Sequence, residues 1–249
     1  MDILRSDYLT FLRDTLIGIV INSPFKEFES KTTEDCRILP FNETNLTLRK
    51  EGKNFPEYGF SMLNIDRMNN IRDLIEIVVK NNIEGDWIEC GVWRGGASIF
   101  ANAVFKTLNE SRKIYVADSF KGFQPCDIGW INHGFCVVDL NTVKDNFKRC
   151  NLLDDNVIFI EGFFNQSLPQ YKDSIDKLSI LRMDADTYNA TTDILNNLYE
   201  KVSINGFIII DDFQIEECKE AVNDFRKTHN IDDPIVLIDW VGAYWKKTC

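Results

Sequence analysis

Long apolar runs are missing from this sequence, and histidine and positive charge are scarce. No run is apolar over the length that crosses a bilayer, so we expect no membrane-spanning helix and no membrane partner. The first residues carry charges within their apolar stretch, unlike a signal peptide, and we expect a cytoplasmic protein. Lys and Arg number 28 against 39 Asp and Glu, a net charge of -11. Such an acidic chain is a poor partner for nucleic acid, because a phosphate backbone repels it.

Metal-binding cysteine pairs are also absent. The seven cysteines are odd in number, lie scattered along the chain and form no C-x-x-C pair. This pattern favours reduced thiols over a disulfide framework or a zinc site. A metal site in this chain would therefore have to be built from oxygen ligands, which Asp and Glu supply.

Apolar patterns change along the chain near residue 60. Residues 1–60 are irregular apart from one helix predicted at 7–21, whereas residues 61–249 alternate between strand-like and helix-like segments. The predicted strands are 86–92, 113–120, 156–164, 177–186, 206–213, 234–240 and 242–247. The predicted helices are 66–82, 95–110, 139–152, 190–202 and 215–230.

This alternation predicts an α/β fold. Strands separated by helices form a mainly parallel central sheet covered by helices on both faces. The last two strands have no helix between them, so we expect an antiparallel edge strand at the C-terminal end. Residues 1–60 then form a helical N-terminal appendage to an α/β domain at 61–249.

Acidic residues follow the predicted strands. In open α/β sheets, ligands bind outside the carboxyl ends of the strands. We therefore expect one acidic edge formed by Glu89, Asp118, Glu161, Asp184 and Asp211.

The turn "IECGVWRGGAS" joins a predicted strand to a predicted helix. Its glycines Gly91, Gly95 and Gly96 allow close approach of a ligand to the backbone, and the helix N-terminus offers N–H groups to an anion. The spacing differs from G-x-G-x-x-G, so a cofactor carboxylate suits it better than a pyrophosphate. An ordinary glycine turn is the alternative. Asp118, after the next strand, can accept both hydroxyls of a ribose, or it can cap a helix.

Two apolar runs end in paired carboxylates, in "ILRMDAD" and "FIIIDDF". Four carboxylates on neighbouring strand ends would repel one another, and a shared Mg²⁺, Mn²⁺ or Ca²⁺ would relieve this repulsion. Asp186 and Asp212 could instead cap the helices that follow. If the strand continues through Asp184 and Asp186, both side chains point to the same face of the sheet.

The sequence contains two histidines, His133 and His229. His229 falls at a polar helix end, where we expect it to be exposed. His133 lies in the aromatic loop "GWINHGF", and its fitness for proton transfer near neutral pH makes it a candidate for catalysis or substrate contact.

Six separated blocks together resemble one protein family. They are "IECGVWRGGASIF", "VADSFKGF", "LRMDADTY", "GFIIIDDF", "AVNDFRKTHNI" and "IDWVGAYWKK". In this order they resemble the TylF/MycF (macrocin O-methyltransferase) family of metal-dependent sugar O-methyltransferases. The resemblance implies a Rossmann-like class I S-adenosylmethionine (SAM)-dependent methyltransferase domain at 61–249, with 1–60 as a lid that excludes water. The loop "CDIGWINHGF" is short for this family, which leaves the acceptor open.

The resemblance also implies roles for individual residues. The cofactor would contact Glu89, Gly91, Gly95, Asp118, Ser119, Glu161 and Gly162, with the ribose on Asp118. The metal ligands would be Asp184, Asp211 and Asp212, and the base would be Asp186, with His133 as the competing choice.

These roles suggest how a sugar hydroxyl could be methylated. Two vicinal hydroxyls would bind the metal ion, which lowers the pKa of a coordinated oxygen, and Asp186 would remove the proton. The expected acceptor is a nucleotide-activated sugar or a glycosylated small molecule in polysaccharide or natural-product biosynthesis. One alternative is a catechol-type O-methyltransferase whose acceptor ring stacks on Phe120, Phe123, Trp130 and Phe135. Another is a nucleotide-binding protein without turnover. The sequence is also compatible with a homo-oligomer.

Overall fold

The computed structural model describes residues 3–28, 36–124, 127 and 136–249. The chain divides into two units, each assembled from three stretches. Unit 1 contains Met1–Arg72, Trp93–Asn109 and Phe120–Leu153, and unit 2 contains Asp73–Val92, Glu110–Ser119 and Asp154–Cys249. The lid at 1–60 and the domain boundary near residue 60 remain predictions.

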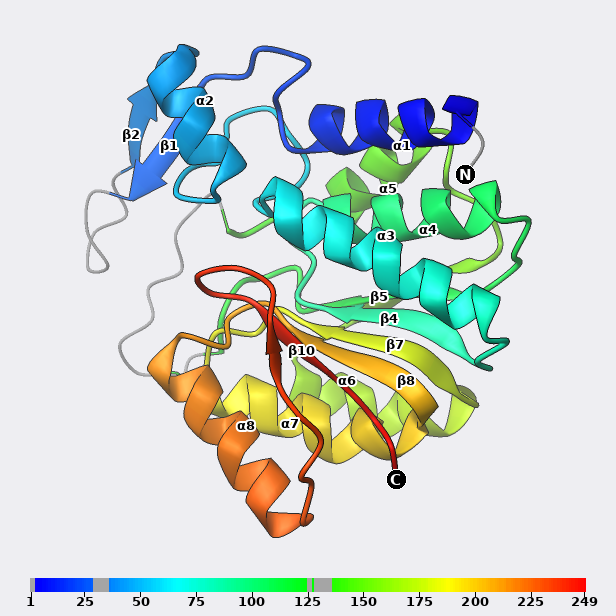
Figure 1. The fold of residues 1–249 in the computed structure, drawn as a ribbon. Coiled ribbons are helices and arrows are strands. Elements are labelled where there is room, and N and C mark those ends of the chain that lie inside the picture. The colour runs from blue at the N-terminus through cyan, green and yellow to red at the C-terminus, as the bar shows by residue number, and fades with distance from the viewer. Residues whose placement is uncertain (1–2, 29–35, 125–126, 128–135) are drawn as a thin grey trace. The chain divides into compact units, whose positions relative to one another are not determined.

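Unit 1 combines helices with a small antiparallel sheet (Figure 1). Its helices are α1 (Ile3–Leu16), α2 (Glu43–Lys50), the first part of α3 (Ile65–Lys80), α4 (Gly96–Thr107) and α5 (Leu140–Arg149). Its sheet has the order β2-β1-β3, with β1 (Phe25–Phe28), β2 (Cys36–Leu39) and β3 (Phe55–Pro56). The predicted N-terminal helix is confirmed, and it ends at Leu16 rather than near residue 21. The sheet and α2 were not predicted, because such short segments show little periodicity.

Main-chain hydrogen bonds connect distant parts of unit 1. The N–H of Phe60 donates to the carbonyl of Leu16 at the end of α1 (2.6 Å), and the N–H of Gly96 donates to the carbonyl of Phe60 (2.9 Å). Arg94 Nη1 donates to the carbonyls of Glu57 and Gly59, at 2.8 Å each. The segment from Glu57 to Phe60 is therefore held both by the end of α1 and by the start of α4.

Unit 2 contains a seven-stranded sheet of order β6-β5-β4-β7-β8-β10-β9. Its strands are β4 (Asp86–Cys90), β5 (Ile114–Asp118), β6 (Val157–Glu161), β7 (Leu178–Met183), β8 (Val202–Ile210), β9 (Val236–Leu237) and β10 (Ala243–Lys246). The five strands from β6 to β8 run parallel, and β10 and β9 are antiparallel additions. This topology confirms the predicted mainly parallel sheet with an antiparallel C-terminal edge.

Helices α6 (Phe164–Tyr171), α7 (Tyr188–Leu198) and α8 (Glu216–Thr228) lie on one face of this sheet (Figure 1). They share an apolar core with alternate residues of the central strands, among them Ile88, Cys90, Leu181 and Met183. Helix α6 was not predicted. Pro169 lies inside it, and this residue has no N–H to bond to the turn before it, which conceals a short helix in the sequence.

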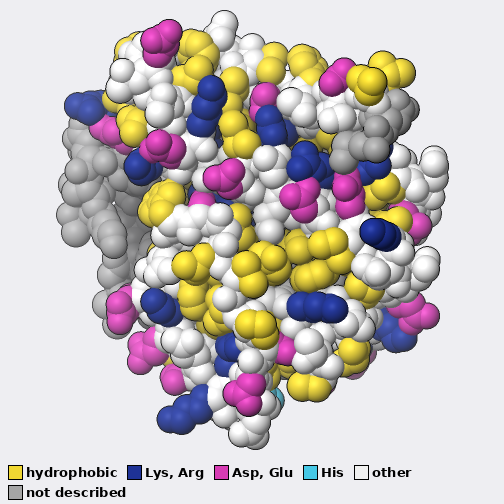
Figure 2. All heavy atoms as spheres, in the orientation of Figure 1, with side chains coloured by type: hydrophobic (Ala, Val, Ile, Leu, Met, Phe, Trp, Pro, Cys, Tyr) yellow, Lys and Arg dark blue, Asp and Glu magenta, His cyan; other side chains and the backbone are white. Residues whose placement is uncertain are grey.

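Two surface properties follow from the described residues. None of their helices combines the length and the apolar character that a membrane crossing demands. On the face drawn in Figure 2, basic and acidic side chains are interspersed rather than gathered into a basic patch.

Candidate active site

The register of the parallel strands brings their carboxyl ends into one row. Asp118 pairs with Glu161, and the N–H of Gly91 donates to the carbonyl of Ala117. The N–H groups of Asp184 and Asp211 donate in turn to the carbonyls of Cys90 and Met183 on the neighbouring strands. The row across unit 2 consists of Glu161, Asp118, Gly91, Asp184 and Asp211. The expected acidic edge is thus present, with Glu89 two residues before Gly91 inside β4.

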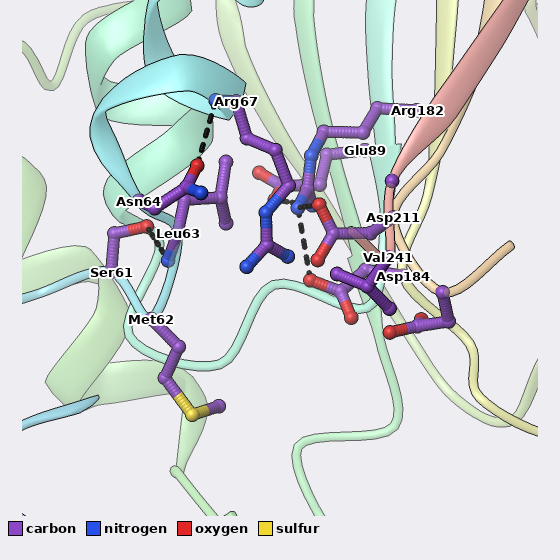
Figure 3. Close-up of polar contacts among 12 residues, drawn as sticks. Ser61, Met62, Leu63, Asn64, Arg67, Glu89, Arg182, Asp184, Asp211 and Val241 are labelled. Atoms are coloured by element: carbon purple, nitrogen blue, oxygen red, sulfur yellow. Dashed lines mark hydrogen bonds and ion pairs between the residues drawn. The ribbon is translucent and has the colours of Figure 1, made fainter. Parts of the chain in front are cut away.

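Arg182 joins three of the acidic side chains (Figure 3). Its Nη1 donates to Oε1 of Glu89 at 2.6 Å. Its Nη2 lies 3.0 Å from Oδ2 of Asp184 and 2.7 Å from Oδ1 of Asp211. The side chain of Arg182 is fully buried, and that of Glu89 is 2% exposed. We call Arg182, Glu89, Asp184 and Asp211 the arginine cluster.

Arg182 is not among the functional residues predicted from the sequence. Burial alone would lower the pKa of its guanidinium, but the negative charges of Asp211, Glu89 and Asp184 outweigh burial and raise that pKa. A buried charge is tolerated only when it is paired and hydrogen-bonded. An arginine inside the apolar run "SILRM" is the sequence signal that could have indicated a buried ion pair.

A second group of carboxylates lies beside the arginine cluster. Asp184, Asp186 and Asp212 each offer an oxygen, and these oxygens lie within 4.8 Å of one another. Burial, followed by the charges of Asp184, Asp211 and Glu217, raises the pKa of Asp186 to about 8. Hard oxygen ligands suit Mg²⁺ or Mn²⁺, and a divalent cation would offset the repulsion that raises this pKa. The side chains present therefore fit a divalent metal ion.

The metal ligands predicted from the resemblance were Asp184, Asp211 and Asp212. The three-carboxylate group contains Asp186 in place of Asp211. The carboxylate of Asp211 contacts Arg182 instead, and 5% of this residue is exposed.

Asp186 and Asp212 do not cap the helices that follow them through their side chains. Helix α7 is capped by Thr187, whose side chain accepts from the N–H of Ala190, and not by Asp186. Helix α8 begins after Ile215 without a side-chain cap. The N–H of Ile215 donates to the main-chain carbonyl of Asp212. The carboxylates of Asp186 and Asp212 are therefore not explained by helix capping.

The backbone changes course between Asp184 and Asp186. Strand β7 ends at Met183, and Asp186 has φ +56°. Neither Asp184 nor Asp186 lies in the strand, so the alternation of a regular strand does not set their directions. Their carboxylates nevertheless come together, with oxygens within 4.8 Å. A left-handed conformation is uncommon for residues other than glycine, and such positions cluster at functional sites.

The glycines of the turn after β4 make room for protein atoms. A Cβ on Gly91 (φ +86°) would lie 1.8 Å from the carbonyl oxygen of Asp184. Gly95 (φ +85°) faces Val143, and a Cβ on Gly96 would lie 2.4 Å from the carbonyl oxygen of Phe60. The N–H of Gly96 is bonded to that same carbonyl, so this particular donor is not available to an anion as expected. Gly91 allows the turn to pack directly on Asp184.

Asp118 lies at the end of β5 and accepts the N–H of Val92 through Oδ2, at 2.8 Å. Its carbonyl accepts the N–H of Gly162 (2.9 Å), which has φ +138°. Ser119 is buried, and Glu161 is the register partner of Asp118. Asp118, Ser119, Glu161 and Gly162 are thus neighbours in unit 2, where a ribose could meet an acidic residue at a strand end.

His133, Trp130 and Phe135 lie outside the described residues. His229 is exposed, as expected, and its ring lies 4.2 Å from that of Phe225 between centroids.

Known proteins resemble this chain over almost its whole length. The family model of macrocin O-methyltransferase (TylF) matches residues 5–247. Mycinamicin III 3''-O-methyltransferase of Micromonospora griseorubida is 39% identical over 213 residues, 80% of this chain and 83% of that protein. The 8-demethyl-8-(2,3-dimethoxy-alpha-L-rhamnosyl)-tetracenomycin-C 4'-O-methyltransferase of Streptomyces olivaceus is 34% identical over 260 residues, 98% of this chain and 94% of that protein.

A solved structure agrees with these relatives. The O-methyltransferase NovP matches with a TM-score of 0.87 and 35% identity, covering 98% of this chain and 100% of that one. The match confirms the predicted Rossmann-like class I methyltransferase fold. The family model and the relatives, all of them O-methyltransferases, favour an enzyme over the alternative of a nucleotide-binding protein without turnover. The chain belongs to the macrocin O-methyltransferase (TylF) family and is an O-methyltransferase.

Proposed function

We propose that this enzyme transfers a methyl group from SAM to a hydroxyl of a sugar on a glycosylated small molecule, with Mg²⁺ or Mn²⁺ at the acidic edge. The observation that carries the proposal is the group Asp184, Asp186 and Asp212, whose oxygens lie within 4.8 Å of one another at the carboxyl ends of β7 and β8. The family implies SAM as the methyl donor. The relative from Streptomyces olivaceus has a rhamnosyl group in its acceptor's name, which supports a sugar acceptor here.

The proposed cofactor residues are those that the family resemblance implies. In unit 2, Asp118 accepts the ribose hydroxyls, Ser119, Glu161 and Gly162 lie by the adenosine, and Glu89 and Gly91 contact the methionine end. Gly95 of unit 1 is assigned to the methionine end by the family resemblance alone. The position of Asp118 at the end of β5, beside Glu161, supports the ribose assignment.

The metal ion would be held by Asp184 and Asp212, with Asp186 and Asp211 next to them. A bound divalent cation supplies positive charge that lowers the pKa of an acceptor hydroxyl. Asp184 belongs both to the arginine cluster and to the three-carboxylate group. Arg182 contacts its Oδ2, and its carboxylate also lies near those of Asp186 and Asp212. This position lets Asp184 orient a ligand oxygen while Arg182 fixes its side chain.

Asp186 is the proposed base that accepts the hydroxyl proton. With a pKa of about 8, most of it is protonated at neutral pH. It becomes a competent base when positive charge nearby lowers this pKa. His133 is the competing base.

The class of acceptor molecule is the most specific part of the proposal. A glycosylated natural product is favoured over a nucleotide-activated sugar or a polysaccharide precursor, because the named acceptor of the Streptomyces olivaceus relative is already glycosylated. A sugar with two vicinal hydroxyls would give the cation two oxygens to bind. An aromatic diol has the same arrangement, so the acceptor test has to include catechols.

The test is a panel of glycosylated small molecules, nucleotide sugars and catechols incubated with SAM labelled in its methyl group. Each reaction is run with Mg²⁺ and with chelator, and products are identified by mass spectrometry. We expect label in a glycosylated acceptor with Mg²⁺ and none in chelator. Equal turnover in chelator would contradict the metal site, and label in catechols alone would contradict the sugar acceptor.

A further inference from the structure

We propose that Arg182 is a positioning residue that couples cofactor binding to metal binding. One guanidinium holds Glu89 on the proposed cofactor side and Asp184 and Asp211 on the proposed metal side. This inference rests on the proposed function, which assigns Glu89 to the cofactor and places both aspartates next to the metal. It adds that the two ligands affect each other's affinity through this side chain.

The sheet fixes the geometry of the coupling. Glu89 and Arg182 are register partners on the adjacent parallel strands β4 and β7. Their neighbours Ile88, Cys90, Leu181 and Met183 point into the core under α6, α7 and α8, so Glu89 and Arg182 lie on the opposite face. Asp184 follows Arg182 by two residues, and Asp211 bonds through its N–H to the carbonyl of Met183. All four residues of the arginine cluster are therefore attached to three neighbouring central strands.

The chemistry of arginine suits this role. The guanidinium is planar, remains charged and directs several N–H donors outward, whereas a lysine ammonium is a compact point charge. Nη1 of Arg182 contacts Glu89, and Nη2 contacts both aspartates (Figure 3). A lysine could keep one charge in the cluster but could not contact these carboxylates through two separate nitrogens, as Nη1 and Nη2 of Arg182 do.

Because Arg182 is buried, its contacts with carboxylates on both sides can couple cofactor binding to metal binding. Arg182 is fully buried, so water cannot replace a carboxylate that is drawn away. A cation bound at Asp184, with Asp211 next to it, would offset the negative charge of both aspartates, which leaves the guanidinium to Glu89. Glu89 is then fixed before the cofactor arrives, and the cofactor binds more tightly. By thermodynamic linkage, the cofactor must tighten metal binding by the same factor.

The test compares the affinity for S-adenosylhomocysteine in Mg²⁺ and in chelator, by calorimetry without any acceptor. The ratio of the two dissociation constants measures the coupling. We expect tighter binding in Mg²⁺ by about fivefold or more for the natural chain, within the usual range of coupling between sites. For Arg182→Lys we expect a ratio near one.

Arg226→Lys is the matched control. Arg226 lies on α8, where its side chain bonds the carbonyl of Asp233 and lies 5.1 Å from the ring centre of Trp245. Neither Asp233 nor Trp245 belongs to the arginine cluster, so we expect Arg226→Lys to keep the ratio of the natural chain. If Arg182 only neutralised buried charge, Arg182→Lys would change both affinities and leave their ratio unchanged, which would overturn the proposal.

A second variant covers the case in which Arg182→Lys does not fold. Glu89→Gln leaves the guanidinium in place and removes the charge on its cofactor side. We expect this variant to bind S-adenosylhomocysteine more weakly both in Mg²⁺ and in chelator. We also expect the ratio of its two dissociation constants to fall to near one. A ratio equal to that of the natural chain would overturn the proposal.

A direct Mg²⁺ titration separates this inference from the proposed function. If Mg²⁺ binds but the natural chain shows a ratio of one, the coupling is wrong and the metal site stands. If Mg²⁺ gives no binding signal with or without S-adenosylhomocysteine, both the metal site and the coupling are wrong.

Discussion

The main-chain N–H of Asp186 donates to Oδ2 of Asp212 at 3.3 Å. This bond connects the segment after β7 to the segment after β8 and brings a third carboxylate up to Asp184. Asp186 reaches this position through a left-handed backbone conformation, with φ +56°. The result is a group of three carboxylates in which one, Asp186, has a pKa of about 8.

Asp186→Asn should lower turnover while leaving cofactor affinity nearly unchanged. Loss of a general base costs typically 10²–10⁴-fold, and the loss should ease as pH rises. The measurement is kcat against pH, with the Mg²⁺ dissociation constant determined in parallel and Asp184→Asn as the comparison. Asp184→Asn should be partly rescued by excess metal. If Asp186→Asn is rescued by metal and His133→Ala abolishes the pH dependence, histidine is the base.

Asp186 should also make the stability of the metal-free protein depend on pH. Its folded pKa of about 8 lies above the ordinary value of 3.8, so the folded state binds more protons between these values. This contribution to stability is present below pH 4 and is lost as pH rises toward 8. In chelator, the urea midpoint of the natural chain should therefore fall more steeply between pH 5 and 8 than that of Asp186→Asn. Parallel pH profiles would contradict the raised pKa.

Asp118→Ala should weaken binding of S-adenosylhomocysteine at least tenfold. A hydrogen bond to a charged group contributes about 1.5–3 kcal/mol, and the ribose would lose two. Because Asp118 also accepts the N–H of Val92, circular dichroism has to confirm that the variant is folded. Asp145→Ala, an exposed carboxylate on α5 that pairs with Lys148, is the matched control and should bind normally. Normal affinity in Asp118→Ala would place the ribose elsewhere.

Gly91→Ala should destabilise the fold strongly. A left-handed conformation costs a residue with a Cβ about 1–2 kcal/mol, and here the Cβ would also lie 1.8 Å from the carbonyl oxygen of Asp184. Thermal unfolding should show a much lower midpoint than in Gly162→Ala. At Gly162, φ is also positive, but the nearest atom would lie 3.2 Å away. Equal midpoints would mean that the turn after β4 can move away from Asp184.

The parallel sheet could be predicted because its strands are apolar and separated by periodic helices. The acidic edge followed from it, since the ends of parallel strands meet at one side of a sheet. The sequence did not reveal β1 to β3, which are too short to show a period, or α6, which contains Pro169. Nor did it reveal the direction of Asp186, which depends on one backbone angle after the strand.

Arg182 shows a different limit of sequence reasoning. Pairing between β4 and β7 brings it next to Glu89, a residue 93 positions away in the chain. No local pattern encodes this neighbour. Only the strand order and register show that an arginine in one apolar run meets a glutamate in another.

The position of the transferred methyl group tests the central proposal most directly. The acceptor should be a glycosylated aromatic compound that carries both a vicinal sugar diol and a phenolic diol in one molecule. With labelled SAM and Mg²⁺, we predict that tandem mass spectrometry and NMR place the label on a sugar oxygen, and that chelator abolishes the product. Label on the phenolic oxygen, or an equal yield of sugar-methylated product in chelator, would contradict the proposed function.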